Sequence, residues 1–225
     1  MRRGAVTALV VFAAWASAAS AAVDIKGVDT SGYPEMRVTV TAPPGSVEPT
    51  LDENGRPVTV DQAVSLAGAK SIVLAVDRSH SMAGRSLRDA TAAALALVHS
   101  IGRTDSVEVI AFGHRAQVVS TFSQSPDATL RDLTVDRTSG TALWDAVTLA
   151  STGLSTRPAT QGRVIVVVTD GQDVSSTATR ATAIRSAVAV HATVYTVGIA
   201  SPDFTPSPLE ALAESTGGSY QEATS

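Results

Sequence analysis

Residues 72–76 read Ile-Val-Leu-Ala-Val, and residues 77–81 continue as Asp-Arg-Ser-His-Ser. An uninterrupted apolar run of this length is typical of a strand covered on both faces of a sheet. The carboxylate of Asp77 and the hydroxyls of Ser79 and Ser81 stand at alternate positions just beyond that strand. The stretch therefore predicts a buried strand that leads into a loop of hard oxygen ligands, the kind that magnesium prefers.

The chain beyond this stretch alternates between strand and helix patterns. Val164–Val168 is again apolar throughout and rich in β-branched residues. Apolar positions repeat with helical spacing between Leu87 and Ile101 and between Leu143 and Leu154. The other predicted elements are a short helix at 209–215 and strands at 107–112, 116–122, 193–199 and 219–222, with 116–122 at a sheet edge. This order predicts an α/β fold with a doubly wound, mostly parallel sheet flanked by helices.

A small β element is predicted before this domain. Met36–Ala42 alternates between apolar and polar residues, as a half-buried strand does. Asn54-Gly55 is a hairpin turn signal, and a second alternating run follows at Val58 and Val60. So few strands are not stable alone, and we expect them to lean on the main domain or to pair with strands that this sequence does not contain. The predicted division is 22–69 for this element and its linker and 70–225 for the main domain.

The first 21 residues have the pattern of a secretory signal peptide. Arg2 and Arg3 precede an uncharged, apolar stretch at 5–16, and Ala16-Ser17-Ala18 and Ala19-Ser20-Ala21 are small-residue cleavage patterns. The protein is therefore predicted to be exported and to be secreted, periplasmic or on the cell surface. The alternative is an uncleaved membrane anchor, because residues 4–23 carry no charge and are long enough to span a bilayer.

Composition excludes several classes of function. The net charge of −4 and the lack of a basic stripe argue against a nucleic-acid-binding protein. The chain has no cysteine, so it has neither a thiolate zinc site nor a thiol nucleophile.

Oxygen-bearing residues gather where three predicted loops leave the same end of the sheet. Ligands of such sheets bind beyond the carboxyl ends of the strands. The residues predicted to meet there are Asp77, Ser79, Ser81, Thr141 and Asp170, with Thr138 as a lesser candidate for the threonine. Each motif alone is also a common turn or helix cap. Together they offer two carboxylates and three hydroxyls with no soft ligand, which suits Mg²⁺ better than zinc or copper.

The three motifs resemble the metal-ion-dependent adhesion motif of the von Willebrand factor type A domain. They are Asp77-x-Ser79-x-Ser81, then Thr141 after Ser139-Gly140, then Thr169-Asp170-Gly171. The resemblance covers about residues 70–222 and implies a six-stranded sheet with Mg²⁺ or Mn²⁺ at its top. It also implies that Ser79, Ser81 and Thr141 contact the ion through hydroxyls, while Asp77 and Asp170 hold it directly or through water. Ser139-Gly140 departs slightly from the two glycines that the family often has, and this departure removes no ligand.

These observations predict a divalent-cation-dependent protein-binding module for adhesion or assembly. Neutral hydroxyls leave the ion electrophilic, so it can accept a Glu or Asp carboxylate from a partner protein. Residues expected to surround that contact are His80, Met82, Thr138 and Gln172. Asp173 is expected either to support the ligands or to be a solvated loop residue. The alternative function is a structural building block of an envelope assembly, in which the ion only stabilises the loops.

Enzymatic signatures are missing from the sequence. A haloacid-dehalogenase-type phosphatase needs a second aspartate as general acid where Ser79 stands. No Gly-x-Ser-x-Gly elbow is present, and the four histidines do not have a metal-binding spacing. The chain is therefore predicted not to be an enzyme.

Overall fold

The protein is described from a computed structural model that covers residues 24–29, 36–42, 50–60, 68–199 and 204–223. The predicted signal segment at 1–21 lies outside these residues. Within them, no helix combines the length and the apolar character needed to cross a membrane.

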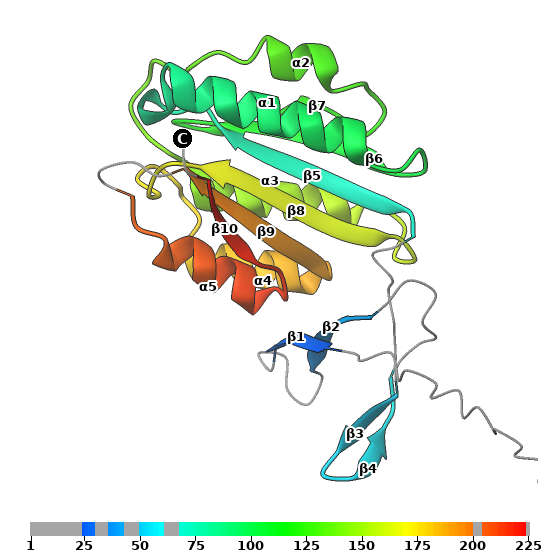
Figure 1. Cartoon of the computed structure of the whole chain (residues 1–225). Helices are drawn as coiled ribbons and strands as arrows, with labels where there is room; N and C mark the ends of the chain where they lie inside the picture. Colours follow the sequence, from blue (N-terminus) through cyan, green and yellow to red (C-terminus); the bar gives the residue numbers. More distant parts are fainter. Residues whose placement is uncertain (1–23, 30–35, 43–49, 61–67, 200–203, 224–225) are drawn as a thin grey trace, which may run out of the picture.

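A six-stranded sheet forms the centre of the main domain, with strand order β10-β9-β8-β5-β6-β7 (Figure 1). Its strands are β5 (Lys70–Asp77), β6 (Ser106–Phe112), β7 (Ala116–Ser120), β8 (Gly162–Thr169), β9 (Ala192–Ile199) and β10 (Tyr220–Ala223). Neighbours are parallel except for the antiparallel pair of β6 and the edge strand β7. The predicted α/β fold with a mostly parallel sheet is therefore confirmed.

Helices cover both faces of the sheet (Figure 1). The core on one side joins the sheet to α1 (Arg85–Ser100), α2 (Asp127–Arg131) and the short helix η1 (His80–Met82). The core on the other side joins it to α3 (Leu143–Ser155), α4 (Arg180–Ala189) and α5 (Ser207–Ser215). The sequence pattern predicted α1, α3 and α5 but not α2 or α4. In α4 the buried residues are only Ala183 and Ala187, which give a weak apolar signal.

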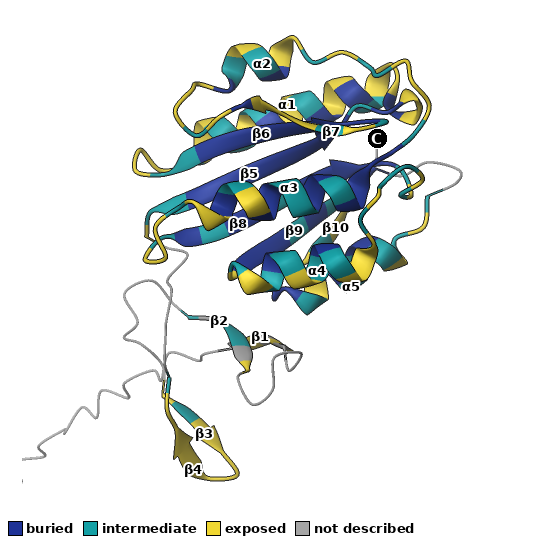
Figure 2. Cartoon of the chain, turned by 180° about the vertical axis from the view of Figure 1, so that it is seen from behind, coloured by how far each residue is buried: buried dark blue, intermediate teal, exposed yellow. Residues whose placement is uncertain are grey.

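The central strands β5 and β8 are buried on both faces (Figure 2). Val73 and Ile165 face the core of α3, whereas Leu74 and Val168 face the core of α1. Burial on both faces explains why these two strands have continuous apolar sequences. β5 ends at Asp77 and β8 ends at Thr169, and the candidate site begins at these two strand ends.

Two small antiparallel sheets precede the main domain. One joins β1 (Asp24–Asp29) to β2 (Arg37–Thr41), and the other joins β3 (Leu51–Glu53) to β4 (Arg56–Val58). Asn54 and Gly55 both have positive φ, 52° and 75°, as expected for the predicted hairpin turn. The side chain of Thr39 packs closely on Gly217. A Cβ added to Gly217 would lie 2.0 Å from the hydroxyl oxygen of Thr39. The β1–β2 element therefore leans on the main domain, one of the two arrangements expected.

Candidate metal-binding site

Three loops converge at the carboxyl ends of β5 and β8. Asp77 is the last residue of β5, Asp170 follows the last residue of β8, and Thr141 precedes α3 by two positions. Because β5 and β8 are parallel neighbours, their following loops emerge side by side. Asp77, Ser79, Thr141 and Asp170 are buried, whereas Ser81 is exposed. The cluster is thus closed below and opens to solvent at Ser81.

The first and third loops are joined by a chain of oxygen contacts. The Ser79 and Ser81 hydroxyl oxygens are 3.0 Å apart, and the Ser81 hydroxyl donates to Oδ1 of Asp170 at 2.8 Å. These contacts bring together residues that are 89 positions apart in the sequence. All the atoms involved are hard oxygens.

The second loop places Thr141 at the same point. A Cβ added to Gly171 would lie 3.7 Å from Oγ1 of Thr141 and 3.9 Å from Oγ of Ser81, so both hydroxyls border this glycine. The carbonyl of Thr141 accepts hydrogen bonds from the amides of Val174 at 3.0 Å and Ser175 at 3.2 Å. These bonds fasten the Thr141 loop to the loop that carries Asp170. All five predicted ligands are therefore gathered in one place.

Gly140 permits the close packing of this second loop. Its φ is +136°, and a Cβ there would come within 2.8 Å of the Ser175 hydroxyl and 2.9 Å of Nδ1 of His114. A residue with a side chain would have to push these neighbours away. The glycine at this position is therefore a packing requirement for the loop that positions Thr141.

Both oxygens of Asp77 are held by hydrogen-bond donors. The Ser79 amide donates to Oδ1 at 2.7 Å, and the Thr169 hydroxyl donates to Oδ2. Burial nevertheless raises the pKa of Asp77 to about 6; these hydrogen bonds oppose the rise and the nearby Asp170 charge adds to it. Burial also raises the pKa of Asp170. Two carboxylates so placed are stabilised in their charged form by a cation between them.

Thr169 is a residue of the site that sequence reasoning did not assign. It is fully buried at the end of β8, and its hydroxyl both donates to Asp77 and accepts from the Gly171 amide at 3.1 Å. Its position as the one polar residue ending an apolar strand was the available signal. Its role is to orient the Asp77 carboxylate.

The residues predicted to surround the partner contact fall into two groups. His80, Thr138 and Gln172 are exposed, as a contact surface requires. Met82 is fully buried in the core beneath α1, so the prediction that it contacts a partner is wrong. Its apolar side chain points inward because the η1 turn anchors the first loop onto the core.

Asp173 has a local structural role. Its carboxylate accepts hydrogen bonds from the backbone amide of Trp144 at 3.3 Å and from the Ser176 hydroxyl. The amide belongs to the first turn of α3, where a negative charge also complements the helix dipole. Asp173 therefore fixes the start of the helix that follows Thr141.

The donor set fits a small divalent cation. Adjacent ligands of an octahedral ion with bonds of 2.0–2.1 Å are separated by about 2.8–3.0 Å. The separations here are 3.0 Å between the two serine hydroxyls and 2.8 Å between Ser81 and Asp170. Within the described ranges, no three His, Cys, Asp or Glu side chains gather as a metal group. A cation at this point would therefore depend on hydroxyls as well as carboxylates.

Comparison with known proteins supports this interpretation of the fold. Residues 72–172 match the family model of the von Willebrand factor type A domain. No curated protein matches the chain. Over these residues the chain is therefore similar to the von Willebrand factor type A domain.

Several solved structures have a similar fold. The conserved hypothetical protein BatB from Bacteroides thetaiotaomicron aligns with a TM-score of 0.59 and 20% identity over 68% of this chain and 90% of its own. A von Willebrand factor type A protein from Catenulispora acidiphila gives 0.60 and 22% over 68% and 38%. Proximal thread matrix protein 1 from the mussel byssus, solved with zinc in its MIDAS motif, gives 0.61 and 19% over 71% and 43%. The TM-scores show a shared fold.

Proposed function

We propose that this chain is a divalent-cation-dependent protein-binding module whose ion is Mg²⁺ or Mn²⁺. Asp77, Ser79, Ser81, Thr141 and Asp170 would hold the ion, and an Asp or Glu carboxylate of a partner protein would complete its coordination. The observation that carries the proposal is the convergence of hard oxygens: the Ser81 hydroxyl lies 3.0 Å from that of Ser79 and 2.8 Å from Oδ1 of Asp170.

The charge and exposure of the cluster support capture of an external anion. The two carboxylates together carry a charge of −2, and the three hydroxyls are neutral and add no further negative charge. The ion can therefore still accept an anionic ligand from outside. Ser81 is the exposed member of the five, so a partner would approach from its side. His80 lies next to it and is also exposed. A partner carboxylate is the natural ligand for such an open position.

We propose binding and not catalysis as the role of this cluster. The Ser79 and Ser81 hydroxyls face each other, and Ser81 donates to Asp170. That arrangement suits several hydroxyls sharing one cation, and it does not single out one of them as a nucleophile. The apolar segment at 5–16 and the small-residue patterns after it support a location outside the cytoplasm.

A second proposed role is structural, with an ion that only stabilises an envelope assembly. The fastening of three loops to one another favours it, because an ion at their junction would tie them further. Thermal melting and partner binding measured together separate the two roles, because any ion bound to the folded state raises the melting temperature. A purely structural ion raises the melting temperature and leaves partner binding unchanged.

The direct test is a pull-down of envelope proteins by the full chain in Mg²⁺ and in EDTA. We expect partners that are retained in Mg²⁺ and lost in EDTA, and that are also lost with Asp77→Ala. The matched control is Asp89→Ala, which removes an exposed carboxylate from α1. Retention of the same partners in EDTA would contradict the proposal. Circular dichroism of Asp77→Ala verifies that the fold is kept.

A further inference from the structure

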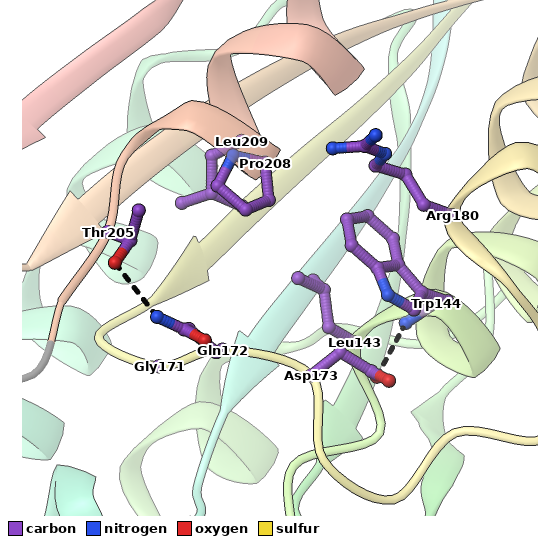
Figure 3. Close-up of a pocket in the computed structure, with 9 residues that line it drawn as sticks. All are labelled: Leu143, Trp144, Gly171, Gln172, Asp173, Arg180, Thr205, Pro208 and Leu209. Carbon is purple, nitrogen blue, oxygen red and sulfur yellow. Dashed lines mark hydrogen bonds between the residues drawn. The ribbon is translucent and has the colours of Figure 1, made fainter.

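A pocket of about 260 Å³, drawn in Figure 3, adjoins the candidate metal site through Gly171. It is bounded by Trp144 of α3, Gln172 of the loop after β8, Arg180 of α4 and Pro208 of α5. Residues from four separate segments thus form a single hollow. The pocket and the metal site share a border at Gly171, which lines the pocket and also adjoins the hydroxyls of Thr141 and Ser81.

The pocket combines apolar walls with polar groups that can meet an anion. Trp144 and Pro208 supply the apolar surface. The Thr205 hydroxyl accepts a hydrogen bond from Nε2 of Gln172 at 2.8 Å, which leaves its own proton free to donate. The carboxylate of Asp173 is already engaged by the Trp144 amide and the Ser176 hydroxyl. An amphipathic side chain with an apolar stem and an anionic end matches this lining.

Arg180 supplies an uncompensated positive charge at the pocket. Its side chain is exposed and reaches from α4 toward Pro208, beside the ring of Trp144 (Figure 3). Among the described residues, no acidic side chain forms an ion pair with it. No acidic group of the described residues therefore competes for its guanidinium, which can pair with an anionic ligand.

The position of Arg180 in its helix makes a stabilising role for this charge implausible. It is the first residue of α4, and the first turn of that helix contains no acidic residue. A positive charge at a helix N-terminus is unfavourable, because it opposes the helix dipole. The helix start is already capped by Thr179, whose side chain accepts from the Thr182 amide. The charge of Arg180 thus contributes nothing to α4 that the structure shows.

We propose that this pocket binds a second acidic side chain of the same partner segment. Its methylene groups would pack on Trp144 and Pro208, and its carboxylate would pair with Arg180 and accept from Thr205. This inference rests on the proposed function, because the first carboxylate is the one held at the cation. The partner recognised would be an acidic segment with two carboxylates a few residues apart.

The probes for this inference are short blocked peptides rich in Gly and Ala. One peptide carries a single Glu, a series carries a second Glu one to three residues away, and a matched series has Gln at that second position. Binding to the full chain is followed in Mg²⁺ and in EDTA by NMR. The reporters are the Gly171 amide and the Trp144 indole resonances, the latter distinguished from Trp15 with Trp15→Phe.

In Mg²⁺, we expect at least one two-Glu peptide to bind about tenfold more tightly than its Gln counterpart, as a charge-assisted contact provides. Arg180→Gln should remove this difference. Arg185→Gln should keep it, because Arg185 lies on the same helix and donates to Thr182 without lining the pocket. The melting temperature of Arg180→Gln should not fall below that of the wild type, which separates lost binding from lost folding.

Two results would contradict the inference, and they differ. Equal affinities for two-Glu and Glu-Gln peptides in Mg²⁺, at every spacing, overturn the pocket and leave the proposed function standing. Absence of any Mg²⁺-dependent binding, even of the single-Glu peptide, contradicts the proposed function and with it this inference.

Discussion

The hydroxyl of Thr169 donates a hydrogen bond to Oδ2 of Asp77, which joins the ends of the neighbouring strands β8 and β5. Both residues are completely buried. Asp77 is therefore oriented by a residue 92 positions away before any cation is present. This relationship links the packing of the sheet directly to the geometry of the candidate site.

Replacing Thr169 with Val keeps the volume of the side chain and removes this hydrogen bond. We expect Mn²⁺ affinity to fall about tenfold, because a buried hydrogen bond to a charged group is worth about 1.5–3 kcal/mol. Isothermal titration calorimetry with Mn²⁺ measures the change. The matched control is Thr196→Val, whose buried hydroxyl donates to the Leu209 carbonyl on α5. An equal loss of affinity in both variants would contradict the assigned role of Thr169.

The pKa of Asp77, raised by burial to about 6 from 3.8, predicts a pH dependence of stability in the metal-free protein. Between these two values the folded state binds more protons than the unfolded state, so the free energy of unfolding falls as pH rises. Urea unfolding in EDTA from pH 4.5 to 7 measures this slope. Asp77→Asn should flatten it, and a wild-type slope equal to that of the variant would contradict the prediction.

The same protonation predicts weaker metal binding in acid. Protons compete with the cation for Asp77 below about pH 6, so the apparent Mn²⁺ affinity should decrease there. Calorimetric titrations at pH 5 and 7.5 test this, and an affinity that does not change between them would count against Asp77 as a ligand.

A separate prediction concerns the packing of α3 on β6. A Cβ at Gly153 would come within 2.4 Å of Oε1 of Glu108, a buried oxygen with no hydrogen-bond partner. Gly→Ala within a helix usually stabilises by about 0.5–1 kcal/mol, but here we expect Gly153→Ala to lower the melting temperature. The double variant Glu108→Ala/Gly153→Ala should melt above Gly153→Ala. A single variant more stable than the wild type would show that the helix accommodates the methyl group.

Much of the fold was predictable because its strands are buried on both faces. The continuous apolar runs at 72–76 and 164–168 mark the central pair β5 and β8, and loops after such strands must lie at one end of the sheet. That rule alone predicts that Asp77 and Asp170 lie close together. Helix α4 was missed because its buried face consists of the alanines Ala183 and Ala187, which give only a weak apolar signal.

The finer features of the site depend on tertiary contacts that no local pattern encodes. Met82 follows the serine ligands closely enough to suggest a surface position, but the η1 turn directs it into the core. The role of Thr169 depends on the alignment of two strands. The pocket at Arg180 forms only where α3, α4 and α5 meet the loop after β8.

The central claim is tested most directly by counting bound Mn²⁺ with electron paramagnetic resonance. For the full chain at pH 7.5, the proposal predicts one Mn²⁺ per molecule, displaced by excess Mg²⁺. Asp170→Ala should lose this ion, and Asp89→Ala on the exposed face of α1 should keep it. Absence of a bound ion in the wild type, or equal binding by the wild type and Asp170→Ala, would contradict the account.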